Sequence, residues 1–219
     1  MPWPKELVLV RHAESEGNVL TVDERAQYDI GTHAYGLTPR GVEQARVTGQ
    51  FLRRAWPNFD VYYTSYYKRS RQTMAIMYPE AKVYEDPRLA EAQRGLWHTM
   101  TEAEIKHHLP FEILRRQRED LYHYRPLGGE NWPDVELRIH SFLGTLHRDC
   151  GDKRVLMVVH GHWLILFQRL IHHFSTEEAL ERYRQKIVSN ASVTVYAAGS
   201  GAELDHLVLR ESCVPWKSD

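Results

Sequence analysis

The chain has little cysteine, no long hydrophobic run and almost no net charge. Cys150 and Cys213 are its two cysteines in 219 residues, too few for the disulfide framework of a small secreted domain. No apolar stretch approaches the roughly 20 residues that cross a bilayer, and residues 1–6 hold no signal-peptide hydrophobic region. We therefore expect a soluble, cytoplasmic protein that makes no membrane contact.

Neither sign of charge predominates, since the chain has 28 Lys and Arg residues and 29 Asp and Glu residues. This balance removes the electrostatic case for nucleic-acid binding, although a local group of arginines can still hold a small anion. Internal repeats, low-complexity tracts and linkers are absent as well. At this length we expect one domain over residues 1–219.

Strand-like and helix-like segments alternate along the chain. Leu7–Val10 and Val155–Val159 are short, continuous apolar runs, typical of strands buried on both faces. The alternation predicts a three-layer α/β sandwich, with a mostly parallel central sheet and helices on both faces. Regularity lapses at about 95–133, which suggests a small helical lid insertion. Further expected strands cover 61–64 and 82–84, and a closing hairpin pairs 193–196 with 204–209 across 199–201. Expected helices follow Thr38-Pro39, Ser65, Thr101 and Ser175, one carries an apolar stripe from Trp132 to Leu146, and two more run from Phe111 to Tyr124 and from Trp163 to Phe174.

Polar residues follow four of the predicted strands. They are Arg11-His12, the Ser65–Arg69 stretch, Glu91, and His160-Gly161. Ligand sites of open α/β sheets lie beyond the carboxyl ends of the strands. We therefore expect these residues to converge although they are far apart in sequence.

This set suits phosphoryl chemistry. Arg11 and Arg69 offer planar, charged forks for phosphate oxygens, and backbone N–H groups at helix starts add partial positive charge. One imidazole nitrogen can attack phosphorus in line and form a phosphohistidine. Glu91 can give a proton to the leaving oxygen and later take one from water, although Glu85 and Asp86 lie close by in sequence. Asn18 can help to hold the anion.

A metal site at His160 is the less favoured interpretation. His162 stands two residues away, but the two side chains alternate if the chain is extended, and the sequence suggests no third ligand. We expect neither a metal nor an organic cofactor.

The chain resembles the histidine phosphatase superfamily, which includes cofactor-dependent phosphoglycerate mutases and fructose-2,6-bisphosphatases. The resemblance covers nearly the whole chain. It is carried by 7–18, Leu37-Thr38 with Gly41, Gln44 and Ala45, Ser65 with Arg69, Gln72 and Thr73, Leu89 with Glu91, Gly95 and Trp97, Gly128–Glu130 with Asp134 and Val135, and Val159–Gly161. It implies that His12 is the nucleophile, that Arg11, Arg69, His160 and Asn18 form the phosphate pocket, and that Glu91 is the proton donor, without a metal.

Several positions depart from the mutase pattern that this resemblance implies. Ala13 stands where a glycine is usual, Gly17 where mutases carry a tryptophan, and Arg94 where they carry a tyrosine; residues 27–37 lack the mutase Gly-Trp-x-Asp signature, and the lid is short. These departures favour hydrolysis. Arg115-Arg116, in contrast, is similar to the paired arginines with which mutases hold a second phosphate.

The sequence therefore predicts a phosphatase acting on a small phosphorylated metabolite through His12. Phosphoglycerate mutase activity that depends on 2,3-bisphosphoglycerate is the first alternative, and a non-catalytic phosphate-binding regulatory module is the second. Besides the catalytic set, we expect Asn18, Gly161, Arg94, Arg115 and Arg116 to contact the substrate. The sequence leaves a homodimer open.

Overall fold

A six-stranded sheet forms the centre of the computed structural model, which describes residues 2–28, 30–199 and 206–217. The strand order is β3-β2-β4-β1-β5-β6. Strands β1 to β4 are mutually parallel, whereas β5 runs antiparallel to both β1 and β6. The strands are β1 Glu6–Arg11, β2 Val61–Thr64, β3 Val83–Glu85, β4 Arg154–Val159, β5 Val193–Ala198 and β6 Leu207–Cys213. The predicted mostly parallel α/β sheet is confirmed.

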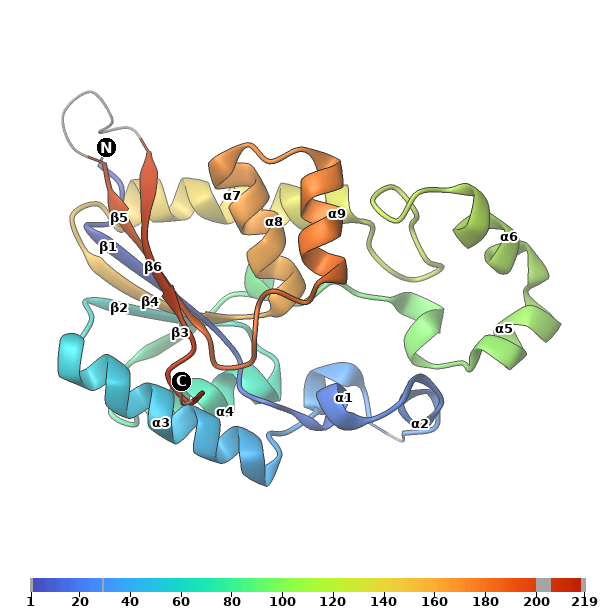
Figure 1. The fold of residues 1–219 in the computed structure, drawn as a ribbon, viewed down its shortest axis with the longest axis horizontal. Helices are drawn as coiled ribbons and strands as arrows, with labels where there is room; N and C mark the ends of the chain where they lie inside the picture. Colours follow the sequence, from blue (N-terminus) through green and yellow to red (C-terminus); the bar gives the residue numbers. More distant parts are fainter. Residues whose placement is uncertain (1, 29, 200–205, 218–219) are drawn as a thin grey trace.

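Alternate residues of the central strands supply two separate cores. Leu7 and Leu9 of β1 pack into one apolar cluster, whereas Val8 and Val10 pack into the other. Side chains of a strand alternate between the faces of its sheet, so both faces must be covered. In Figure 1 helices α7, α8 and α9 lie on one side of the sheet and α3 and α4 on the other, which gives the three layers expected from the sequence.

The long helices follow their sequence signals closely. Helix α3 (Pro39–Ala55) starts after Thr38, whose hydroxyl accepts a hydrogen bond from the Gly41 N–H at 3.0 Å. Capping boxes open five further helices. The other α-helices are α1 Glu16–Val19, α2 Val22–Ala26, α4 Lys68–Met77, α5 Glu102–His108, α6 Pro110–Arg118, α7 Trp132–Asp149, α8 Gly161–His172 and α9 Thr176–Arg184. Short 3₁₀ helices are η1 Thr32–Ala34, η2 Pro87–Leu89 and η3 Gly95–His98.

Two predicted helix boundaries were wrong. Helix α4 begins at Lys68 instead of after Ser65, because the buried Ser65 hydroxyl hydrogen-bonds His160 Nε2 at 2.9 Å. The helix expected from Phe111 to Tyr124 ends at Arg118. Strand β6 is described from Leu207, whereas 204 and 205 of the expected strand, and 200 and 201 of the expected turn, lie outside the described residues.

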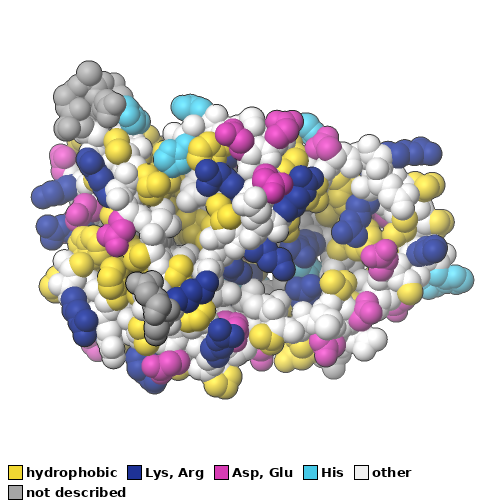
Figure 2. Space-filling view, viewed as in Figure 1, with side chains coloured by type: hydrophobic (Ala, Val, Ile, Leu, Met, Phe, Trp, Pro, Cys, Tyr) yellow, Lys and Arg dark blue, Asp and Glu magenta, His cyan; other side chains and the backbone are white. Residues whose placement is uncertain are grey.

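The segment between β3 and α7 projects to one side of the sheet. Helices α5 and α6 form its outer part, beyond η3 (Figure 1). Helices α1 and α2, which the sequence did not predict, lie on the same side. A hollow opens between this side and α9, and Lys and Arg side chains gather in it (Figure 2).

Candidate active site

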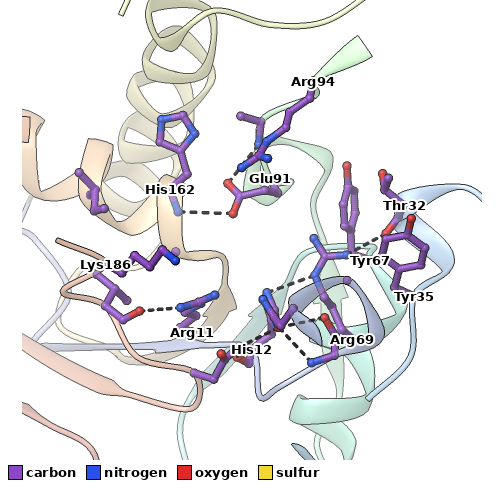
Figure 3. A pocket seen from close by; sticks show the side chains of 18 of the residues that line it. Arg11, His12, Thr32, Tyr35, Tyr67, Arg69, Glu91, Arg94, His162 and Lys186 are labelled. Carbon is purple, nitrogen blue, oxygen red and sulfur yellow. Dashed lines mark hydrogen bonds between the residues drawn. The ribbon is translucent and has the colours of Figure 1, made fainter. Parts of the chain in front are cut away.

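A cavity of about 570 Å³ lies at the carboxyl ends of the parallel strands. Its volume falls within the usual range for small-molecule sites. The residues that follow β1, β2, β3 and β4 contribute to it together, as Figure 3 shows for Arg11, His12, Arg69 and Glu91. The predicted convergence of distant segments is therefore present in the structure.

His12 is held as a neutral ring whose Nε2 carries the lone pair. Its Nδ1 lies 2.7 Å from the Ala13 carbonyl oxygen, and its Nε2 accepts a hydrogen bond from Arg69 Nε at 3.1 Å. A carbonyl can only accept, so the proton sits on Nδ1 and the lone pair on Nε2. Burial, together with the charges of Arg69 and Arg11, lowers the pKa of His12 well below its usual range.

Arg11 reaches the cavity across the start of helix α8. Its Nη1 donates to the Val188 carbonyl at 2.6 Å, whereas its buried Nε has no partner among the described residues. A Cβ on Gly161 would lie 3.1 Å from that Nε. Gly161 therefore leaves room for the Arg11 guanidinium to lie against the helix N-terminus, where an anion is also favoured.

Arg69 is buried beside two imidazoles. Besides its bond to His12, its Nη1 donates to the Thr32 carbonyl at 2.8 Å, and its Nη2 lies 3.3 Å from His160 Nδ1. No carboxylate lies within 4 Å of it among the described residues. Burial lowers the pKa of Arg69 to about 10, so the group stays charged at neutral pH and its charge is not neutralised by a partner.

His160 lies behind the cavity, whereas the sequence predicted a phosphate contact there. Its side chain is fully buried, and its Nε2 is shared by the hydroxyls of Ser65 and Ser70 at 2.9 and 3.4 Å. Burial and the Arg69 charge lower the pKa of His160 well below its usual range. In this structure His160 orients Arg69 instead of lining the pocket.

Glu91 faces the positive groups from the opposite wall (Figure 3). Its Oε1 accepts from the Ala92 N–H at 3.1 Å and its Oε2 from the His162 N–H at 3.4 Å. Arg138 of α7 fixes the approach to this position, since it donates to the carbonyl oxygens of Arg88 and Ala90. The Glu91 side chain is therefore held at the N-terminus of helix α8.

Asn18, Gly161 and Arg94, which the sequence predicted to contact the substrate, also line the cavity. Arg115 and Arg116 do not line it, so the structure gives no support to the predicted substrate contact of the lid arginines. Arg115 pairs with Glu112 and Glu119 at 2.8 and 3.0 Å. Arg116 lies 4.1 Å from the centre of the Trp97 ring. Both guanidinium groups are occupied on the lid itself.

Sequence reasoning missed a second group of lining residues. Arg25 comes from α2, His98 from η3, and Tyr183 and Lys186 from the end of α9 and the loop after it. No pattern marked them, because α2 is short and the loop follows no strand. His162 was considered only as a metal ligand, although its place beside Gly161 at the start of α8 signals access to the same space.

Positive charge dominates the cavity. Among the described residues that line it, six are Lys or Arg and one, Glu91, is a carboxylate. Burial and the neighbouring arginines lower the pKa of His98 to about 4, and burial lowers that of His162 to about 4. These rings are neutral at neutral pH, so the cavity attracts anions through its arginines.

The described residues include no group of three or more His, Cys, Asp and Glu side chains placed to hold a metal ion. Among the same residues, no helix is both long and apolar enough to pass through a membrane.

Comparison with known proteins shows which family and which solved structures this chain is similar to. The family model for the histidine phosphatase superfamily (branch 1) matches residues 7–207. Phosphoserine phosphatase 1 of Hydrogenobacter thermophilus is 34% identical over 158 residues, which cover 71% of this chain and 70% of that protein. A 2,3-bisphosphoglycerate-dependent phosphoglycerate mutase of Methylobacterium radiotolerans is 32% identical over 165 residues, 72% and 74% of the two chains. The alpha-ribazole phosphatase structure from Shigella flexneri aligns with a TM-score of 0.72 at 22% identity over 94% of both chains, which shows a shared fold.

Proposed function

Because this chain belongs to the histidine phosphatase superfamily, branch 1, we propose that it hydrolyses a small phosphomonoester through a phosphohistidine on His12. The observation that carries the proposal is the tautomer of His12. Its Nε2 lone pair lies in a cavity lined by Arg11 and Arg69, while its Nδ1 proton is bound to the Ala13 carbonyl. This is a nucleophile that needs no base to activate it.

The first chemical step transfers the phosphoryl group to the protein. Nε2 of His12 attacks phosphorus in line, a new N–P bond forms and the bond to the ester oxygen breaks. Arg11 and Arg69 stabilise the charge on the three phosphoryl oxygens. Glu91, on the opposite wall, enters this step in its protonated form, gives its proton to the departing alkoxide, which leaves as an alcohol, and is left as a carboxylate.

The second step returns the protein to its starting state. The Glu91 carboxylate takes a proton from a water molecule as that water attacks phosphorus, the N–P bond breaks, and inorganic phosphate leaves. Nε2 of His12 regains its lone pair. The proton stays on Nδ1 and donates to the Ala13 carbonyl throughout, so the ring carries one positive charge only while it is phosphorylated.

Hydrolysis is preferred over phosphoryl transfer to a second metabolite because the lid arginines do not reach the cavity. Arg115 and Arg116, which resemble the mutase pair, are engaged with Glu112, Glu119 and Trp97. The cavity therefore receives no arginine from the outer lid in this structure. Relatives named as a phosphatase and as a mutase are similar to the chain at nearly equal identity, so their names alone do not decide.

The test measures both reactions in one preparation. Release of inorganic phosphate from p-nitrophenyl phosphate and from a panel of phosphorylated metabolites is expected for the wild type and lost in His12→Ala. His140→Ala, at an exposed histidine of α7, is the matched control and keeps the activity. Rapid interconversion of 2- and 3-phosphoglycerate primed by 2,3-bisphosphoglycerate would overturn the preference for hydrolysis. Anion binding without any turnover would instead indicate a regulatory module.

A further inference from the structure

We propose that Arg25 and Arg94 bind a second anionic group of the substrate, so that the preferred substrate is a small phosphomonoester with an additional carboxylate or phosphate. This inference rests on the proposed phosphatase reaction and assigns the specificity of the same cavity. It places the second anion on α2 and at the start of η3, and not on the lid arginines.

The first argument is the surplus of positive charge. A phosphate monoester carries close to two negative charges, which Arg11 and Arg69 match beside His12. Arg25 and Arg94 line the cavity in addition, and neither has a carboxylate within 4 Å among the described residues. Arg46, another exposed arginine, in contrast pairs with Glu43 on α3.

The second argument is that these two guanidinium groups face the same space. Arg25 Nη1 donates to the Gly17 carbonyl at 3.1 Å, and Arg94 Nη2 donates to the Tyr183 hydroxyl at 3.1 Å. These contacts hold the side chains from opposite sides. Burial, followed by the charge of Arg94, lowers the pKa of Arg25. Two like charges that repel each other across a cavity are relieved by an anion placed between them.

The third argument is a buried hydroxyl, without a partner among the described residues, on which charges of both anion sites act. Tyr35 is 3% exposed and lines the cavity, and its hydroxyl has no hydrogen-bond partner among the described residues. The charges of both Arg25 and Arg69 act on it. A buried hydroxyl is normally paired, so this one is available to a bound substrate that spans from Arg69 to Arg25.

The experiment compares ligands that differ only in the second group. 3-Phosphoglycerate and glycerol 3-phosphate differ by a carboxylate in place of a hydroxymethyl group, and fructose 1,6-bisphosphate and fructose 6-phosphate differ by a second phosphate. Each is measured as a competitor of p-nitrophenyl phosphate hydrolysis. Each is also titrated by calorimetry into His12→Ala, which cannot form the phosphohistidine. The two pairs distinguish a carboxylate from a phosphate.

We expect at least one pair to show a preference of roughly 10- to 100-fold for the doubly anionic member, the effect of a charged hydrogen bond. Arg25→Gln and Arg94→Gln should each remove most of that preference, measured as the ratio of the two inhibition constants within each pair. Arg46→Gln, on the far-side helix α3, is the matched control and should retain the preference.

Three results would overturn the subsite. They are equal binding within both pairs, a preference that survives in Arg25→Gln and Arg94→Gln, and a preference that is lost in Arg116→Gln instead. Failure of the proposed reaction has a different signature, namely hydrolysis that does not depend on His12. Calorimetry still reports the ligand preference in that case, so the two failures are distinguishable.

Discussion

At the scale of single residues, neutral imidazoles among arginines define the site. His12 keeps its proton on Nδ1 because the Ala13 carbonyl accepts it, and Arg69 Nε points at the other nitrogen. His160 supports Arg69 from behind and is itself held by Ser65. The result is a nucleophile whose orientation and protonation are fixed before any substrate arrives.

Glu91→Gln is the substitution that isolates the proton transfer. The amide keeps the size and the hydrogen-bond acceptor of the carboxylate but cannot donate an acidic proton. The kcat/KM for an alkyl phosphate should fall by about 10²- to 10⁴-fold. The kcat/KM for p-nitrophenyl phosphate should fall by less than about tenfold, since that leaving group needs little protonation. These kcat/KM values report the steps up to phosphohistidine formation and exclude the second step, which also uses Glu91, so equal slowing of both contradicts the general-acid role.

At the scale of elements, the site depends on how helix α8 meets strand β1. The helix starts at Gly161, directly after β4, and the Arg11 guanidinium of the neighbouring strand lies across that first residue. The same helix start supplies the His162 N–H to Glu91. One junction therefore positions a phosphate ligand and the proposed acid together.

Gly161→Ala tests this junction. The new Cβ would lie 3.1 Å from Arg11 Nε, so the guanidinium must shift by a few tenths of an ångström. We expect kcat/KM to fall at least about tenfold while the thermal midpoint changes little, because a flexible side chain yields more readily than the backbone.

Gly144→Ala in α7 is the matched control, since nothing lies within 4 Å of its added Cβ. It should leave kcat/KM unchanged and raise the unfolding free energy by about 0.5–1 kcal/mol, the usual gain in a helix interior. Equal loss of activity in both variants would show that the Arg11 contact is not the cause.

Most elements, and the site residues at the strand ends, could be predicted from the sequence, whereas other lining residues could not. Buried strands and capped helices follow from local patterns, and so did the strand-end residues of the site. Arg115 and Arg116 were misplaced because consecutive helical residues point about 100° apart, and each found its own partner on the lid. Arg25 and Lys186 were missed because α2 and the loop after α9 carry no periodic signal, and their place depends on tertiary packing.

At the scale of the whole molecule, the neutral histidines tie stability to pH. Burial lowers the pKa of His98 and His162 to about 4, against roughly 6.5 in an unfolded chain. His12 and His160 shift in the same direction. Between about pH 4 and pH 6.5 the unfolded chain binds more protons at these histidines than the folded chain does, so acidification favours unfolding.

We therefore expect the unfolding free energy to be constant above about pH 7 and to fall between pH 6.5 and 5. His98 and His162 should contribute at most about 2 kcal/mol each over this interval. Urea unfolding at a series of pH values measures the slope, and His98→Gln should reduce it. A free energy that stays level from pH 7 to 5 would show that these rings are not held neutral.

The most direct measurement is to trap the covalent intermediate on the intact protein. Rapid quenching during turnover of a ³²P-labelled phosphomonoester, followed by peptide mapping, should place the label on His12, in a form that is labile in acid and stable in base. His12→Ala should carry no label. An acid-stable adduct, or a label on His160 or His162, would contradict the account.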